Sequence, residues 1–192
     1  MLNLKEKISD YSLTISNCLS SPLINLINEE IYVNPDSWSA GPIADGMNSD
    51  VRSVKVSGFE EQDIGTSVSK RVIFNELKKI VSRIEEAYRK NISEYYFSEK
   101  NYFQFLYYDD KMKGHYEYHT DNCYTNPRNL TILIGLNSKG EYEGGELFIG
   151  NDKNGIKLDR GDMICFPSNF MYPHKVQRVV KGQRKVLIIW TQ

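Results

Sequence analysis

Three side chains that could hold a metal ion occur in two short segments of the chain. His119 and Asp121 lie in Tyr116–Asp121, whose aromatic and β-branched residues indicate a strand. Residues i and i+2 of a strand point to the same face, so one imidazole and one carboxylate should share a space. His174 follows 55 residues later (174 − 119), beside the strand-like segment Lys175–Val180. Two histidines and one carboxylate form the ligand set that holds Fe(II) and leaves positions open for substrate molecules.

Arg184 could supply a fixed positive charge near this metal. It lies ten residues after His174 (184 − 174) and directly precedes the apolar strand-like segment Lys185–Trp190. An arginine fork binds a carboxylate through two parallel hydrogen bonds. A charge at the edge of a strand would also account for Arg184, but its distance from His174 and the strand that follows favour anion binding.

This ordered set of residues resembles the Fe(II)- and 2-oxoglutarate-dependent dioxygenases, and in particular their prolyl-4-hydroxylase-like branch. The run Gly144–Phe148 is similar to that branch's Gly-Gly-Glu stretch, and Gly161-Asp162 to its Gly-Asp turn. The resemblance extends from about Leu13 to Trp190. It implies Fe(II) as cofactor, 2-oxoglutarate and O2 as cosubstrates, succinate and CO2 as co-products, and ascorbate as a candidate reductant. It implies no catalytic residue beyond the metal site.

The resemblance also implies contacts with 2-oxoglutarate. Arg184 would neutralise its distal carboxylate, and Tyr108 would donate a hydrogen bond to the same group. Tyr107 is the alternative to Tyr108, and it would point to the opposite face of their strand. Thr131 would reach the same carboxylate, although a β-branched residue in a sheet accounts for it equally well. Gly135 stands where the family often has a tyrosine, which removes one possible contact.

The substrate prediction is a prolyl residue of a peptide or protein. Arg128 and Tyr142 are the candidate substrate residues at the mouth, and the acidic turn around Tyr142 could close over a chain. A proline-rich peptide is already extended and stacks on aromatic rings, so it loses little entropy on docking. One alternative is hydroxylation of a free amino acid or another small molecule, and another is a non-catalytic jelly-roll binding module. His115 is off the metal pattern and is expected in a loop or at the surface.

Short strands after Tyr102 must position these residues. They are predicted at Phe103–Tyr108, Tyr116–Asp121, Leu130–Leu136, Glu146–Ile149, Met163–Phe166, Lys175–Val180 and Lys185–Trp190. Many strands at this spacing imply a sandwich or barrel, and the family has a double-stranded β-helix (jelly roll). The predicted fold is therefore mainly β with flanking helices, the N-terminal helices packing on one sheet.

The segments before Tyr102 contain the helical signals. Ser69–Lys90 carries an apolar stripe at helical spacing, and a second helix is predicted to open at Ser21-Pro22 with the serine as N-cap. The loops at 33–50, 60–68 and 109–115 are expected to form the mouth. Residues 1–11 could be a tail or a short helix.

Length and composition restrict the functional classes. The 192 residues fit a single dioxygenase domain over 1–192, with a helical part to about 100 and the β-helix core from about 101. Apolar (40%) and charged (26%) residues are in ordinary proportion, and a net charge of −1 gives no general field for nucleic acid or a membrane. Three cysteines without metal or redox spacing, and no apolar leader or membrane span, predict a cytoplasmic protein. The oligomeric state is not predicted.

Overall fold

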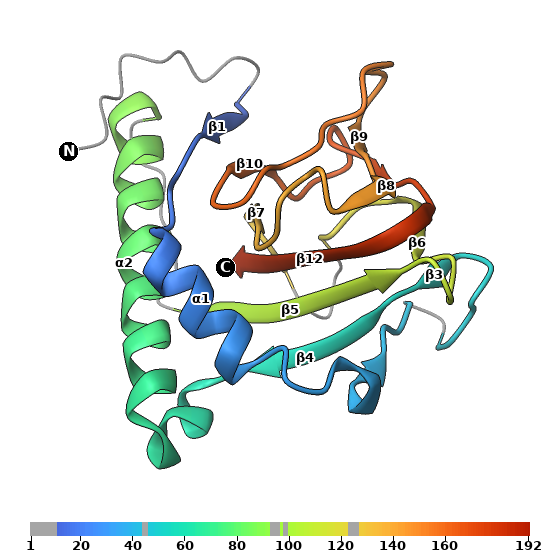
Figure 1. Cartoon of the computed structure of the whole chain (residues 1–192). Coiled ribbons are helices and arrows are strands. Elements are labelled where there is room, and N and C mark those ends of the chain that lie inside the picture. The colour runs from blue at the N-terminus through green and yellow to red at the C-terminus, as the bar shows by residue number, and fades with distance from the viewer. Residues whose placement is uncertain (1–10, 44–45, 93–96, 98–99, 123–126) are drawn as a thin grey trace.

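The computed structural model describes residues 11–43, 46–92, 97, 100–122 and 127–192. In this part of the chain, two antiparallel sheets lie face to face, and two α-helices cover the outer face of the larger one (Figure 1). The predicted fold class, a jelly roll with N-terminal helices on one sheet, is confirmed. Residues 1–10 and Cys123, one of the three cysteines, lie outside the described residues.

The larger sheet has the order β1-β10-β7-β12-β5-β4-β2, and β8 pairs with β12 at its side. Its strands are β1 (Leu13–Ile15), β10 (Met163–Pro167), β7 (Leu130–Gly135), β12 (Val179–Thr191), β5 (Asn101–Asp109), β4 (Lys55–Phe59), β2 (Ser39–Ala40) and β8 (Tyr142–Gly144). The smaller sheet has the order β3-β6-β11-β9. Its strands are β3 (Arg52–Ser53), β6 (His115–His119), β11 (His174–Val176) and β9 (Leu147–Ile149).

The helices α1 (Ser21–Glu30) and α2 (Val68–Asn91) begin at serine caps. Ser20 Oγ accepts a hydrogen bond from Leu23 N at 3.4 Å, and Ser67 Oγ accepts one from Lys70 N at 3.3 Å. The predicted cap Ser21 is thus one residue late, because Ser21 is already helical. Two short 3-10 helices, η1 (Pro35–Ser37) and η2 (Glu61–Thr66), lie in the segments predicted as loops.

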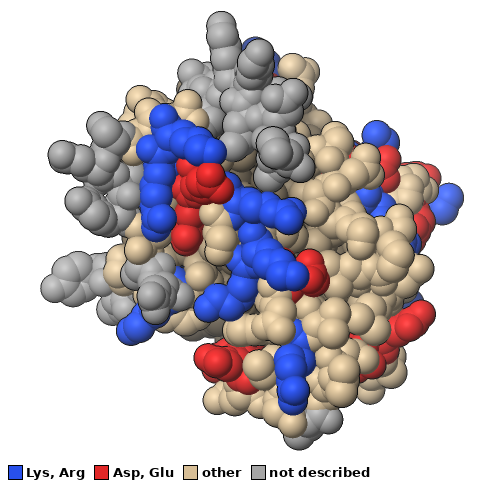
Figure 2. All heavy atoms as spheres, turned by 90° about the vertical axis from the view of Figure 1, so that its left-hand side faces the viewer, with Lys and Arg blue, Asp and Glu red and all other residues tan. Residues whose placement is uncertain are grey.

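Helix α2 is amphipathic. Its buried stripe packs on the sheet and comprises Ile73, Phe74, Leu77, Ile80, Val81, Ile84, Ala87 and Tyr88. Lysine and arginine side chains gather on the face of the molecule that carries α2, turned to the viewer in Figure 2. Neither helix of the described chain is long and apolar enough to cross a membrane.

Two apolar cores result from the alternation of side chains along the strands. On β12, Leu187 and Ile189 face the helices, whereas Val186 and Ile188 face the smaller sheet. The helix-side core includes Leu77, Phe105 and Ile132, and the inter-sheet core includes Leu147, Phe166 and Val186. Of these two regions, the space between the sheets is where a metal site could form.

The C-terminal strands differ from the predicted ones. The segments predicted at 175–180 and 185–190 are instead a short β11 and one long strand, β12, that begins at Val179. Gly182, inside β12, has a φ of +77°, and a Cβ there would lie 2.2 Å from Glu141 O. The strand continues through this residue because glycine accepts both the dihedral angle and the close approach.

His115 is not in a loop or at the surface, so that prediction is wrong. It is the first residue of β6 and is 3% exposed. Its Nδ1 lies 2.9 Å from Lys113 O and its Nε2 3.0 Å from Asp50 O. The pairing of β6 with β3, which no local sequence pattern shows, buries it.

Candidate metal centre

The pairing of β6 with β11 brings the three predicted metal ligands together. His174 lies opposite His119 in the register of the two strands. Asp121 lies two residues beyond the end of β6, in a bend and not in the strand that was predicted to include it. The ligand atoms of the three side chains all lie within 4.8 Å of one another. The carboxylate oxygens of Asp121 are 3.6 Å from His119 Nε2 and 3.4 Å from His174 Nε2.

Backbone carbonyls fix which nitrogen of each imidazole can bind a metal. Glu117 O lies 2.8 Å from Nδ1 of His119, and Tyr172 O lies 3.1 Å from Nδ1 of His174. A carbonyl oxygen can only accept, so both Nδ1 atoms donate when the rings are neutral. The lone pairs are then on the Nε2 atoms, which face Asp121.

The charge states suit a divalent cation. Burial would raise the pKa of Asp121, but its interactions with the side chains of His119 and His174 hold it well below its ordinary value. Burial lowers the pKa of His119, and the interaction with Asp121 offsets this only in part. A neutral imidazole and an ionised carboxylate are the states that a metal requires. The donor set therefore fits Fe(II) held on one face of its coordination sphere.

The triad lines a cavity of about 270 Å³ between the two sheets. Arg184 lines the same cavity and is only 2% exposed. Within the described chain, its Nη1 atom is buried without a hydrogen-bond partner. A buried donor without an acceptor is costly, so this guanidinium fits an anionic ligand such as a carboxylate.

Gly145 leaves the space that Arg184 occupies. A Cβ at Gly145 would lie 2.9 Å from Arg184 Cδ, and the φ of Gly145 is +70°. Tyr108 lies opposite Arg184 in the register of β5 and β12, and the guanidinium carbon is 5.1 Å from its ring centre. The Gly-Gly-Glu stretch thus has a physical role in the placement of the arginine.

Tyr108 lies on the cavity side of β5, and Tyr107 packs in the helix-side core. Burial raises the pKa of Tyr108, and the charge of Arg184 partly offsets the rise. Tyr108 therefore keeps its proton and can donate to an anion beside Arg184. Of the two tyrosines left open by the sequence, Tyr108 has the position that a cosubstrate contact needs.

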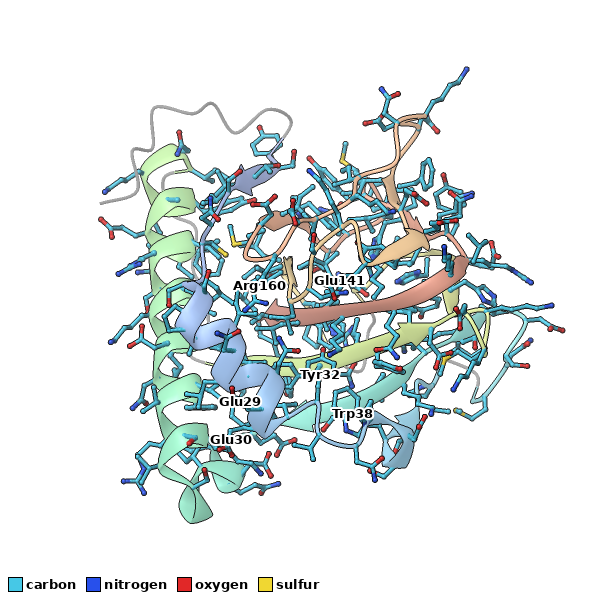
Figure 3. The ribbon with its side chains drawn as sticks, viewed as in Figure 1. Glu29, Glu30, Tyr32, Trp38, Glu141 and Arg160 are labelled. Carbon is cyan, nitrogen blue, oxygen red and sulfur yellow. The ribbon has the colours of Figure 1, made fainter. Side chains whose placement is uncertain are left out.

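Tyr32 fixes the two strands that carry Tyr108 and Arg184. Its hydroxyl lies 3.0 Å from Leu106 O on β5 and 3.1 Å from Val186 O on β12. Its ring centre is 4.9 Å from that of Trp38, and both residues are labelled below β5 in Figure 3. The segment after α1 therefore supports the site from the helix side of the sheet.

Thr131 and Gly135 each have a close neighbour that the sequence did not predict. Thr131 Oγ1 donates a hydrogen bond of 2.7 Å to Asp121 Oδ2, so its hydroxyl contacts the candidate metal ligand. A Cβ at Gly135 would lie 2.4 Å from Asp159 O. The backbone at Asp159 therefore fills the space beside Gly135, and the missing side chain does not widen the pocket.

The two predicted substrate residues lie in different surroundings. Arg128 lines the cavity, with its guanidinium carbon 3.7 Å from the ring centre of Trp190. Tyr142 is not in a turn at the mouth, so that expectation is wrong. It lies in β8, is 5% exposed and has Lys157 Nζ 4.6 Å from its ring centre. The pairing of β8 with β12 buries the ring.

Sequence reasoning missed Tyr116 and Arg52. The ring of Tyr116 stacks on His119, with centroids 3.4 Å apart and planes at 17°. The guanidinium carbon of Arg52 lies 4.5 Å from the centre of the Tyr116 ring. An aromatic residue three positions before a metal-ligand histidine was a visible signal, whereas the position of Arg52 depends on the two-residue strand β3.

Comparisons with known proteins agree with this geometry. The family model of the 2OG-Fe(II) oxygenase superfamily matches residues 103–192. A PKHD-type hydroxylase of Prochlorococcus marinus (strain MIT 9215) is 29% identical over 177 residues, which are 88% of this chain and 72% of the relative. A second, from strain MIT 9515, is 37% identical over 82 residues, which are 41% of this chain and 36% of the relative.

Solved structures share the fold. A prolyl hydroxylase from Trichoplax adhaerens, in complex with a peptide of the hypoxia inducible factor oxygen degradation domain, superposes with a TM-score of 0.78 at 19% identity. The match covers 98% of this chain and 86% of that one. A Pseudomonas putida prolyl-4-hydroxylase gives a TM-score of 0.76 at 14% identity, with coverage of 98% and 96%.

The superfamily match and the PKHD-type relatives identify an oxidoreductase, and its fold is a jelly roll. The match to the 2OG-Fe(II) oxygenase superfamily spans residues 103–192, a little under half of the chain, and includes the three candidate metal ligands and Arg184. Within the superfamily, the PKHD-type relatives and the prolyl hydroxylase structures support the prolyl-4-hydroxylase-like branch.

Proposed function

We propose that this protein is an Fe(II)- and 2-oxoglutarate-dependent dioxygenase that hydroxylates a prolyl residue of a peptide or protein. The observation that carries the proposal is one cavity that holds both the His119, Asp121 and His174 cluster and the buried guanidinium of Arg184. A metal site alone would fit many functions. A buried arginine beside it, with its Nη1 atom lacking a partner among the described residues, adds a place for a cosubstrate carboxylate.

Each residue of the site has a separate task in this proposal. His119, Asp121 and His174 would hold Fe(II), which supplies the O2-dependent oxidation that converts 2-oxoglutarate to succinate and CO2. Arg184 would bind the distal carboxylate of 2-oxoglutarate, and Tyr108 would donate a hydrogen bond to it. Both side chains belong to a rigid antiparallel pair of strands, so they would hold the cosubstrate in one orientation.

The proposed substrate class is supported by a solved structure of the same fold and by the residues that line the cavity. The Trichoplax adhaerens enzyme is in complex with a peptide and has the same fold. In this chain, Arg128 and the ring of Trp190 line the side of the cavity near Asp121. An aromatic ring with a cation beside it suits an extended proline-containing segment.

The experiment is a succinate assay followed by mass spectrometry of the products. The enzyme receives Fe(II), 2-oxoglutarate and ascorbate with a panel of proline-containing peptides or free amino acids, and one arm omits ascorbate to test the need for a reductant. A peptide product heavier by one oxygen atom on proline is expected. Oxygen addition to a free amino acid and to no peptide would replace the peptide substrate with a small molecule.

Two histidine variants distinguish metal binding from a general effect on folding. His174→Ala should abolish both metal binding and turnover, because only two ligands remain. His115→Gln is the control, since His115 lies on the same strand as His119 but its ring nitrogens face backbone carbonyls. Turnover by folded His174→Ala at the wild-type rate would refute the metal assignment.

A further inference from the structure

Asp121 lies beyond the end of β6, so other contacts must hold its carboxylate. Thr131 Oγ1 lies 2.7 Å from Asp121 Oδ2, and Ser168 Oγ lies 2.8 Å from Thr131 Oγ1. The exposed fractions of Asp121, Thr131 and Ser168 are 7%, 0% and 1%. The three side chains form a buried hydrogen-bond relay that ends on the candidate metal ligand.

The number of protons sets the direction of this relay. The hydrogen bond between the two residues runs from the Thr131 hydroxyl to Asp121 Oδ2, so the carboxylate is the acceptor. Thr131 has one hydroxyl proton and must give it to Asp121. Ser168 must therefore donate its own proton to Thr131 Oγ1, although the distance alone leaves that direction open.

The backbone holds both ends of the relay. Ser168 directly follows β10, and Thr131 lies opposite Phe166 in the register of β7 with β10. Ser168 N donates to Asn129 O at 2.9 Å, and Ser168 O accepts from Asn122 N at 3.0 Å. The segment around Ser168 therefore connects to the residue next to Asp121 as well as to the strand of Thr131.

A second buried threonine shows that burial in this sheet does not itself require such a partner. Thr191, on β12, is fully buried and lies opposite Leu130, the neighbour of Thr131. Its hydroxyl has no hydrogen-bond partner within the described chain. Burial in the sheet therefore does not explain why the Thr131 hydroxyl has hydrogen-bond partners, and neither does the β-branched shape of its side chain.

We propose that Ser168 and Thr131 are positioning residues that set the rotation of the Asp121 carboxylate for metal binding. With one side of Oδ2 taken by the Thr131 proton, the carboxylate is directed to bind the metal through a single oxygen atom. The proposal rests on the proposed metal site, and it assigns Thr131 to Asp121 rather than to 2-oxoglutarate. Partners of metal ligands of this kind typically contribute 10–100-fold to metal affinity.

The test is anaerobic titration of the purified protein with Co(II), followed by its visible absorption spectrum, without turnover. Thr131→Val removes the donated proton and keeps the shape, so it should weaken Co(II) binding by about tenfold or more and shift the spectrum. Thr131→Ser should restore both, because it returns the hydroxyl. Thr191→Val is the matched control and should leave both unchanged.

Ser168→Ala tests the second step and serves if Thr131→Val does not fold. It leaves Thr131 its proton for Asp121, so it should weaken Co(II) binding by less than Thr131→Val does. Wild-type affinity and spectrum in both variants would overturn the proposal. So would a Thr131→Val protein that binds metal normally and has lost affinity only for 2-oxoglutarate. If the wild type itself fails to bind Co(II), the proposed function fails before the relay is tested.

Discussion

Arg184 has its guanidinium buried beside Tyr108, and its Nη1 atom has no hydrogen-bond partner among the described residues. If it binds the distal carboxylate of 2-oxoglutarate, Arg184→Ala should weaken 2-oxoglutarate binding by at least about tenfold, since a hydrogen bond to a charged group contributes about 1.5–3 kcal/mol. Co(II) affinity should remain near that of the wild type. Arg184→Lys should recover part of the loss, as a point charge without the fork. Equal anaerobic 2-oxoglutarate affinity in the wild type and Arg184→Ala would remove this role.

The residues of the site could not all be predicted equally well from the sequence. His119, His174 and Arg184 follow from type and spacing, because the chemistry of a metal and an anion demands those side chains. The environments of Thr131 and Tyr142 do not follow from type and spacing, because these environments depend on which strands pair. A hydroxyl beside a strand partner can bind a cosubstrate or a metal ligand, and only the register of β7 with β10 places Thr131 near Asp121 and Ser168.

At the scale of elements, the short strand β8 holds the beginning of β12 and so supports Arg184. Gly144 ends β8 with a φ of +75°, and a Cβ there would lie 2.1 Å from Arg178 O. Gly144→Ala should therefore lower the free energy of unfolding by more than about 2 kcal/mol, because both the dihedral angle and the backbone contact oppose a side chain.

The control for this change is Gly140→Ala in the turn before β8. The nearest atom to a Cβ at Gly140 is Ser138 Oγ at 3.8 Å, so the free energy of unfolding should change by no more than about 0.5 kcal/mol. Chemical denaturation of both variants measures the difference. A Gly144→Ala protein as stable as Gly140→Ala would mean that the β8–β12 pairing does not constrain this residue.

The elements themselves were largely predictable where their periodicity is strong. The stripe of α2 gave its limits to within one residue at each end, 69–90 against 68–91, because apolar side chains recur at helical spacing over its whole length. The strands β2 and β3 each have two residues, which is too few to show an alternation of buried and exposed side chains in the sequence. The break expected between 180 and 185 is absent, because Gly182 pairs with Tyr142 of β8 and β12 continues through it.

At the scale of the whole molecule, the larger sheet separates a core that supports it from a core that surrounds the site. Leu77 belongs to the helix-side core and Leu147 to the inter-sheet core, where it lines the cavity of the triad. Both leucines are fully buried, so Leu77→Ala and Leu147→Ala remove the same side-chain atoms from an apolar core. Each should lower the free energy of unfolding by about 2–5 kcal/mol.

The two variants should differ in function. Leu147 precedes Phe148 and Ile149 on β9, and Ile149 lies opposite His174, so a cavity at Leu147 removes a wall beside the metal ligands. Leu147→Ala should therefore weaken both Co(II) and 2-oxoglutarate binding, measured at a temperature where the protein is fully folded. Leu77→Ala, under the same conditions, should bind both ligands as the wild type does, since the sheet lies between it and the site. An equal loss of ligand affinity in the two variants would show that the sheet transmits a disturbance from the helix-side core to the metal centre instead of isolating one from the other.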